Sequence, residues 1–357
     1  MSKREEFVAK ARALAEEIGE VADRPMTLME VCGTHAHQFA RYGLAQMIPT
    51  HVQLLSGPGC PVCVTSAGEI DAALELARQP GVTIATFGDM VRVPGSESTL
   101  AHERARGANV KVFFSPMEAV DLAEQTDGEV VLLGVGFETT TPGVAVAVAE
   151  AKRRGLPNFS VMTAHKRLIP ALAALMAAED VSVHGLLAPG HVSTIIGAGA
   201  YREFVEQFHV PCVVAGFEPD QILRGVLALV RQLAEDRAEV ENEYPGAVSE
   251  EGNLKALAAI DEVFEPTDSE WRGLGVIPGG GFGVREEYAD LDALARFEIE
   301  LPESREHPAC RCGEVLRGAI RPPECSAFGA ACTPEHPLGP CMVSSEGACA
   351  AVYKYEG

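Results

Sequence analysis

The cysteines of this 357-residue chain are concentrated where they could hold a metal or carry redox chemistry. Six of the ten lie in the last fifth of the sequence, separated by long and irregular gaps. Four thiolates can hold a [4Fe–4S] cluster and leave a pair that cycles between dithiol and disulfide. The alternative is a structural zinc site of four cysteines with two spare thiols. The six are Cys310, Cys312, Cys325, Cys332, Cys341 and Cys349.

A second set of thiols lies nearer the N-terminus, in the motif CGTH that begins at Cys32 and the motif CPVC that begins at Cys60. The first motif predicts a helix that begins near His35, preceded by Cys32 or Thr34. A thiol at a helix N-terminus has its thiolate favoured by the helix dipole, so Cys32 is predicted to be the nucleophilic or metal-binding thiol. Cys60 and Cys63 have the spacing of either a reversible disulfide or a shared metal site.

Two generic interpretations of these N-terminal residues stay open on the residues alone. Three thiols and the imidazole of His35 could form a closed zinc site with four ligands. A thioredoxin-like oxidoreductase is the other interpretation, although its C-x-x-C motif needs no second Cys-His pair.

The elements that must position these side chains alternate between short β-rich runs and Ala/Leu/Glu-rich helical stretches. This alternation predicts an α/β fold with mostly parallel strands. We expect an α/β domain over residues 1–128, a second over 129–240, and a small Cys-rich iron–sulfur domain over 241–357, with a glycine-rich connection near VIPGGGFGV. The predicted strands are 52–55, 82–87, 110–114, 130–135, 159–163, 185–188 and 211–215.

An internal repeat supports two related α/β domains. The segment from Pro58 to Phe87 is echoed, with one gap, by the segment from Pro189 to Phe217. The loop that carries Cys60 in the first copy carries His191 in the second. Ligands of open α/β sheets gather at the carboxyl ends of strands, so both loops lie where sites are usually built.

The composition limits the partners and the location. The 29 Lys and Arg against 51 Asp and Glu give a formal net charge of −22, which disfavours nucleic acid and anionic membranes. The sequence has no run of about 20 apolar residues that could cross a bilayer and no apolar signal segment. We therefore expect a cytoplasmic protein.

Five segments together resemble the HypD family of hydrogenase maturation factors over nearly the whole chain. The resemblance implies a scaffold on which the Fe(CN)2CO group of [NiFe]-hydrogenase is assembled, in complex with a HypC-type chaperone and with cyanide from a HypE-type donor. It implies iron binding by Cys32 with His35 beside it, and a redox-active or auxiliary pair at Cys60 and Cys63. The segments are MEVCGTHAHQFARYGL, LLSGPGCPVC, FGDMVRVPGS, GFETTTPG and the tail CRCGEVLRGAIRPPECSAFGAACTPEHPLGPCMVSSEGACAAVYKY.

The same resemblance implies roles for the C-terminal cysteines. Cys312 and Cys341 would be the redox pair, and our own hypothesis is that electrons pass from the cluster through this pair to Cys60 and Cys63. The implied ligands of a [4Fe–4S] cluster are Cys310, Cys325, Cys332 and Cys349, and the neighbours Cys310 and Cys312 can exchange roles.

Two rival functions belong to other classes. One is a zinc-stabilised thiol–disulfide oxidoreductase that acts on proteins, and the other is a docking scaffold whose thiols only hold structure. Metal content separates the first rival from the iron scaffold, because a brown anaerobic preparation rich in iron contradicts a zinc protein.

Overall fold

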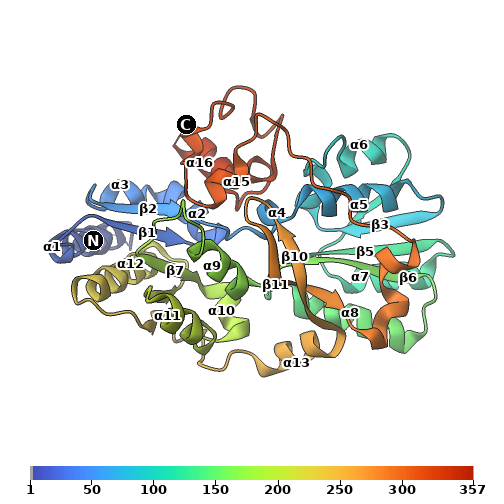
Figure 1. Cartoon of the computed structure of the whole chain (residues 1–357), viewed down its shortest axis with the longest axis horizontal. Coiled ribbons are helices and arrows are strands. Elements are labelled where there is room, and N and C mark those ends of the chain that lie inside the picture. The colour runs from blue at the N-terminus through green and yellow to red at the C-terminus, as the bar shows by residue number, and fades with distance from the viewer. Residues whose placement is uncertain (1–2, 357) are drawn as a thin grey trace.

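Two parallel β-sheets form the framework of the chain in the computed structural model, which describes residues 3–356 (Figure 1). The predicted α/β class with mostly parallel strands is confirmed. A two-stranded antiparallel hairpin and a Cys-rich C-terminal region complete the structure.

The first sheet is apolar on both faces, as a parallel sheet covered by helices requires. Its strand order is β2-β1-β7-β8-β9. Alternate side chains point to opposite faces, so Leu28 packs in one apolar core and its neighbour Met29 in the other. The strands are β1 (Met26–Glu30), β2 (Val52–Ser56), β7 (Gly185–Pro189), β8 (Cys212–Ala215) and β9 (Val240–Asn242).

Helices cover both faces of this sheet. Helices α1 to α3 and α12 share one apolar core with it, and helices α9 to α11 share the other. Their bounds are α1 (Lys3–Val21), α2 (Gly33–Tyr42), α3 (Leu44–Met47), α9 (Leu168–Met176), α10 (Gly190–Ile196), the 3-10 turn η2 (Gly199–Tyr201), α11 (Arg202–Phe208) and α12 (Pro219–Ala234).

The second sheet has the strand order β4-β3-β5-β6 and is likewise covered on both faces. Its strands are β3 (Val82–Thr86), β4 (Asn109–Val112), β5 (Glu129–Gly136) and β6 (Phe159–His165). The surrounding elements are α4 (Pro61–Val64), α5 (Ala67–Arg78), η1 (Gly88–Arg92), α6 (Leu100–Ala105), α7 (Met117–Gln125), α8 (Thr141–Arg154), α13 (Leu254–Val263), η3 (Glu286–Leu291) and α14 (Ala293–Arg296).

The two sheets share one topology. In each sheet, the second strand along the chain is the edge strand and pairs with one side of the first strand, and the third strand pairs with the other side of the first. In such sheets the chain leaves the two central strands in opposite directions, and a crevice opens at their carboxyl ends. The crevice of the first sheet lies beyond β1 and β7, and that of the second lies beyond β3 and β5. These ends are where a site is expected.

Sheet membership does not follow the order of the sequence. The chain makes β1 and β2, crosses to the second sheet for β3 to β6, and returns to the first sheet for β7 to β9. The expected boundary at residues 128/129 therefore falls inside the second sheet, because β3 and β5 are hydrogen-bonded neighbours. The two repeat-like segments also differ in place, since β7 pairs with β8 whereas β2 and β3 belong to different sheets.

The hairpin of β10 (Phe264–Trp271) and β11 (Gly275–Val284) lies between the two sheets in Figure 1. The glycine-rich stretch expected to be a connection is β11 itself, and its glycines allow close packing. A Cβ on Gly281, for example, would lie 2.6 Å from Ser269 Cβ and 3.1 Å from the carbonyl oxygen of His165. The C-terminal region holds α15 (Cys312–Leu316), η4 (Pro322–Glu324), η5 (Pro340–Met342) and α16 (Ala348–Tyr355).

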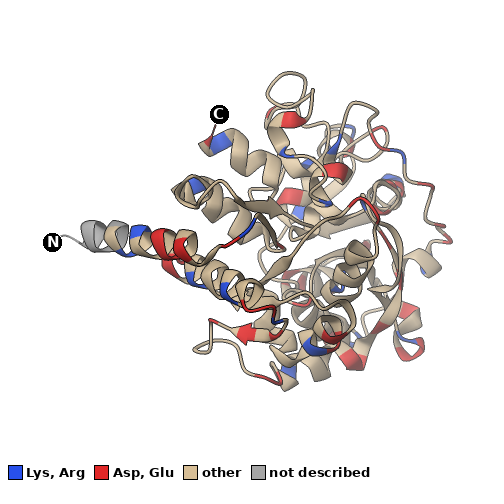
Figure 2. Cartoon of the chain, turned by 60° about the vertical axis from the view of Figure 1, so that its left-hand side comes forward, with Lys and Arg blue, Asp and Glu red and all other residues tan. Residues whose placement is uncertain are grey.

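Acidic and basic residues occur together along the surface, as Figure 2 shows on the N-terminal helix that projects from the body of the molecule. Lys10 of α1 pairs with Asp220 of α12 at 2.7 Å. Within residues 3–356, no helix has the length and apolar character needed to cross a bilayer.

Candidate functional site

Cys32 lies at the crevice of the first sheet, two residues after β1 and at the N-cap position of α2. The helix begins at Gly33, two residues before the predicted start near His35. The backbone amides of Thr34 and His35 face the Cys32 sulfur. The side chain is buried, with 5% of its surface exposed. The fold thus places this thiol where α/β sheets usually build sites.

Burial outweighs the helix N-terminus in setting the charge of this thiol. Desolvation raises the pKa of Cys32, and the nearby Glu30 carboxylate raises it further, while the two helix amides lower it less. The amides at the helix start thus favour the thiolate as expected, but in the metal-free protein burial outweighs them and the pKa of Cys32 is raised. A bound cation reverses this balance, because a coordinating thiol is deprotonated outright.

Glu30 is a site residue that sequence reasoning missed. Its Oε2 accepts a 2.8 Å hydrogen bond from the backbone N–H of Cys32. Burial raises the pKa of Glu30 to about 8. No spacing rule singles out this carboxyl, because it closes a strand of ordinary length.

His35 is fully buried, and its ring is directed toward the end of β8. Its Nε2 lies 2.9 Å from the Gly216 carbonyl oxygen, and its ring centroid is 5.2 Å from that of Phe217. Within residues 3–356 its Nδ1 has no hydrogen-bond partner. Burial lowers the pKa of His35 to about 4, so the ring is neutral at pH 7. Its role as a metal ligand stays a prediction.

His191, in the loop of the second repeat-like segment, lies at the same crevice as His35, since both rings contact Phe217. It is exposed in α10, two residues after β7, and stacks on Phe217 with ring centroids 3.8 Å apart. Desolvation lowers its pKa, and the Glu346 carboxylate opposes that shift. The repeat contained the signal, because it aligned the His191 loop with the Cys60 loop.

Cys60 and Cys63 form a disulfide at the start of α4, and both are buried. Their loop lies directly against the Cys32 turn, since the backbone N–H of Gly33 donates a 2.9 Å hydrogen bond to the carbonyl oxygen of Gly59. A Cβ on Gly59 would overlap the Cys32 backbone nitrogen, so only glycine fits this contact. The structure therefore brings together the two N-terminal motifs.

The six C-terminal cysteines line one pocket. Cys312 and Cys341 are joined as a disulfide, and Cys310, Cys325, Cys332 and Cys349 are free thiols. Burial raises the pKa of Cys349, and the charges of the other three free thiols raise it further, so all four lie within electrostatic reach of one another.

This donor set fits a [4Fe–4S] cluster. A Cβ on Gly339 would overlap the sulfur of Cys310, so the glycine keeps that side of the pocket open. Within residues 3–356, no three His, Cys, Asp or Glu side chains converge on one point that could hold a metal ion. A cluster does not require such convergence, since each of its four thiolates binds a different iron. The ligand assignment stays a prediction.

The two disulfides belong to one buried apolar cluster. Helix α4, which carries Cys63, packs against the turn η5, which carries Cys341. Segments that are far apart in the sequence are thus adjacent in the fold.

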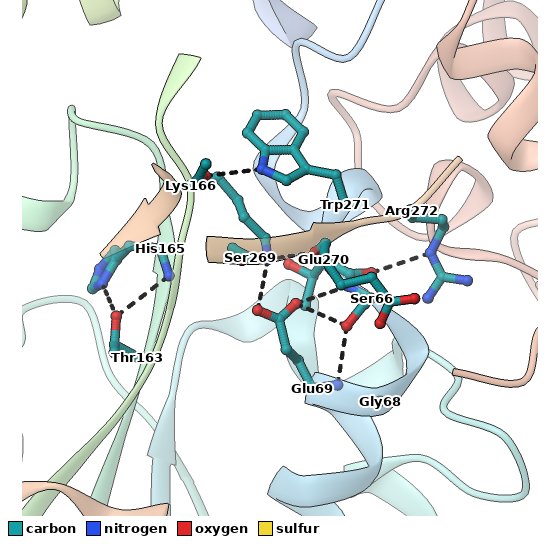
Figure 3. Close-up of polar contacts among 12 residues, drawn as sticks. Ser66, Gly68, Glu69, Thr163, His165, Lys166, Ser269, Glu270, Trp271 and Arg272 are labelled. Carbon is teal, nitrogen blue, oxygen red and sulfur yellow. Dashed lines mark hydrogen bonds and ion pairs between the residues drawn. The ribbon is translucent and has the colours of Figure 1, made fainter. Parts of the chain in front are cut away.

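A buried polar network supports the loop that follows Cys63 (Figure 3). Lys166, directly after β6, extends its ammonium toward Glu69 of α5 at 2.6 Å and toward Ser269 Oγ of the hairpin at 2.7 Å. Ser66 and Glu69 form a capping box that fixes the start of α5. The network connects α5, β6 and β10.

Comparison with known proteins places this arrangement in a family. A family model described as HypD, hydrogenase formation hypA family, matches residues 9–356. The chain belongs to the HypD family. The hydrogenase maturation factor HypD of Azotobacter vinelandii is 48% identical over 97% of this chain and 94% of that protein. The HypD of Escherichia coli K12 is 45% identical over 98% of this chain and 94% of that protein. The HypD of Rhodobacter capsulatus is 44% identical over 98% and 95%.

Proposed function

We propose that this HypD-family chain is the scaffold on which the Fe(CN)2CO group of [NiFe]-hydrogenase is assembled, with Cys32 as the protein ligand of the iron. The observation that carries the proposal is the position of Cys32 at the crevice of the first sheet, on a helix N-terminus and against the Cys60–Cys63 loop. A soft thiolate suits low-spin iron, and one protein ligand leaves positions open for diatomic ligands.

The proposed partners follow from the Fe(CN)2CO group, which we call the cargo. A HypC-type chaperone would supply a further ligand to the iron, and a HypE-type protein would supply the cyanide. The net charge of −22 favours partners that present basic patches, since charge complementarity steers association.

The C-terminal pocket would hold a [4Fe–4S] cluster through Cys310, Cys325, Cys332 and Cys349. When bound, the cluster supplies electrons to neighbouring sulfur. The free state of these four thiols and the pairing of Cys312 with Cys341 support this division of roles.

Electrons would pass between the two thiol pairs by disulfide exchange. One thiolate of reduced Cys312/Cys341 attacks a sulfur of the Cys60–Cys63 disulfide, and its partner thiol resolves the mixed disulfide. The C-terminal pair becomes the disulfide, and Cys60 and Cys63 leave as thiols that take up two protons. The packing of α4 on η5 supports this step.

Two measurements test the proposal. We expect an anaerobic preparation to be brown and to contain about 4 Fe or more with little zinc, whereas a colourless zinc protein would support the oxidoreductase rival. We expect Cys312→Ser to leave Cys60 and Cys63 oxidised and iron loading reduced. An unaltered redox state and unaltered iron loading would contradict the exchange between the pairs.

A further inference from the structure

A short segment between Cys341 and Cys349 lies across the start of α2. We call residues 344–346 the strap. Thr34 Oγ1 donates a 2.9 Å hydrogen bond to Glu346 Oε1 of the strap. A Cβ on Gly33 would lie 2.5 Å from Glu346 Cβ and 2.7 Å from its carbonyl oxygen. The strap therefore touches the residue next to Cys32, and glycine makes that approach possible.

The strap lies at the carboxyl end of β1, beside the Cys32 turn. The Glu346 carboxylate accepts its hydrogen bond from Thr34, two residues after Cys32 at the N-cap of α2. Only 5% of the Cys32 surface is exposed. For Cys32 to bind an incoming iron group, more of its side chain must become accessible.

The backbone N–H of Ser344 joins the strap to Pro340 of η5, and beyond that turn hydrogen bonds of single side chains join it to both sheets. Ser344 Oγ donates a 2.9 Å hydrogen bond to Asp89 Oδ2, in the turn after β3 of the second sheet. His37 Nδ1 of α2 lies 3.0 Å from the carbonyl oxygen of Ser345. The strap bridges the crevices of the two sheets through hydrogen bonds that single side chains make.

The N-terminal end of the strap is connected to a redox centre. Cys341, three residues before Ser344, is bonded to Cys312. Gly347, directly after the strap, packs so closely on Cys341 that a Cβ there would lie 2.8 Å from the Cys341 Cα. The position of the strap therefore depends on where Cys341 is held.

We propose that the strap is a redox-controlled cover over Cys32, held closed by the Cys312–Cys341 disulfide and released when that disulfide is reduced. The inference rests on the proposed function, because a cover over this thiol matters only if Cys32 receives cargo. The reductant is a dithiol: the Cys312–Cys341 bond breaks, the dithiol supplies two electrons and two protons, and it leaves as a disulfide. Losing the cross-link gives the 341–347 segment more conformations and weakens a contact made by few hydrogen bonds.

The test measures access to Cys32 without any cargo. The full chain with its metal retained is treated anaerobically with iodoacetamide, and alkylation of the Cys32 peptide is followed by mass spectrometry. A Cys60→Ser/Cys63→Ser background ensures that only the C-terminal disulfide changes. We expect alkylation to be about tenfold faster after reduction with dithiothreitol, which is the effect of losing one or two hydrogen bonds. An equal rate in both states would overturn the proposal.

Two variants of the oxidised protein separate the strap from other effects of reduction. Gly33→Ala should displace Glu346 and give the fast rate without dithiothreitol. The control Gly143→Ala is in the first turn of α8, where its Cβ would meet only Pro116 Cγ at 3.8 Å, and it should keep the slow rate. Ser344→Ala loses the Asp89 contact away from Cys32, and it should also accelerate alkylation. A slow rate in both Gly33→Ala and Ser344→Ala would contradict the cover.

Failure of the cover can be distinguished from failure of the proposed function. If alkylation is insensitive to the C-terminal disulfide while Cys32 still binds iron that carries cyanide and carbonyl, the cover is wrong and the scaffold stands. If iron binding survives Cys32→Ala, the scaffold assignment is wrong whatever the alkylation rates are.

Discussion

Lys166 Nζ and Glu69 Oε1 lie 2.6 Å apart, and both side chains are buried in the protein interior. The ammonium also donates to Ser269 Oγ and to the carbonyl oxygen of Glu270, so all three of its protons have acceptors. Glu69 belongs to the capping box at the start of α5, which follows the Cys60–Cys63 loop. The ion pair therefore fixes the element that carries the chain away from the disulfide.

Lys166→Met should destabilise the fold by about 3–5 kcal/mol, because it leaves the Glu69 carboxylate buried and unpaired. Chemical denaturation measures the change in the free energy of unfolding. The matched control is Lys152→Met, which removes an exposed ion pair with Asp290 and should cost no more than about 1 kcal/mol. Equal losses in the two variants would show that the buried pair has no special role.

Glu138 makes the stability of the fold depend on pH. Its Oε1 accepts a 2.9 Å hydrogen bond from the backbone N–H of Leu168, and within residues 3–356 its Oε2 has no partner. Burial raises its pKa from 4.5 to about 7. The folded state therefore binds more protons than the unfolded state between these values, and stability falls as the pH rises through them.

Glu138→Gln removes this titration and keeps the acceptor for Leu168. Relative to the wild type, the variant should gain about 3 kcal/mol between pH 4.5 and 8, and the gain should stop above the folded pKa. Denaturation at a series of pH values measures it. Glu150→Gln is the control, since Arg153 and Arg154 lower the pKa of Glu150: its difference from the wild type should be constant between pH 4.5 and 8 and should change only as the pH falls below 4.5. A pH-independent difference for Glu138→Gln would contradict the buried, unpartnered carboxyl.

The four free C-terminal cysteines should be needed for the cluster, and the disulfide pair should not. Serine at Cys310, Cys325, Cys332 or Cys349 should each lower bound iron and acid-labile sulfide, because a cluster needs four thiolates. Cys341→Ser should retain both. Anaerobic metal and sulfide analysis of each purified variant makes the comparison. Loss of the cluster in Cys341→Ser with retention in Cys310→Ser would reverse the assignment.

The sequence predicted most strands because they are apolar runs bounded by turn residues. All seven predicted runs correspond to β2 through β8. Strand β1 was not predicted, because its five residues include Thr27 and Glu30 and form no long apolar run. The glycines of β11 suggested a connection, whereas the hairpin uses them for close packing.

The pairing of strands into two sheets could not be predicted. The chain crosses to the second sheet between β2 and β3 and returns at β7, and both crossings depend on tertiary packing. The same limit applies to the site. The cysteine motifs indicated Cys32 and Cys60, but Glu30 and Glu346 reach the site only through the fold. Burial raises the pKa of Cys32 by more than the amides at the helix N-terminus lower it. A spacing rule contains no information about burial.

Infrared spectroscopy of the Cys32→Ala variant, co-purified anaerobically with a HypC-type chaperone, the proposed partner, tests the central claim most directly. The control is Cys212→Ala, a buried cysteine at the opposite end of the strands of the same sheet. We predict that Cys32→Ala loses the cyanide and carbonyl bands while the visible absorption of the cluster stays intact, and that Cys212→Ala keeps both. Cyanide and carbonyl bands that survive in Cys32→Ala would contradict the account.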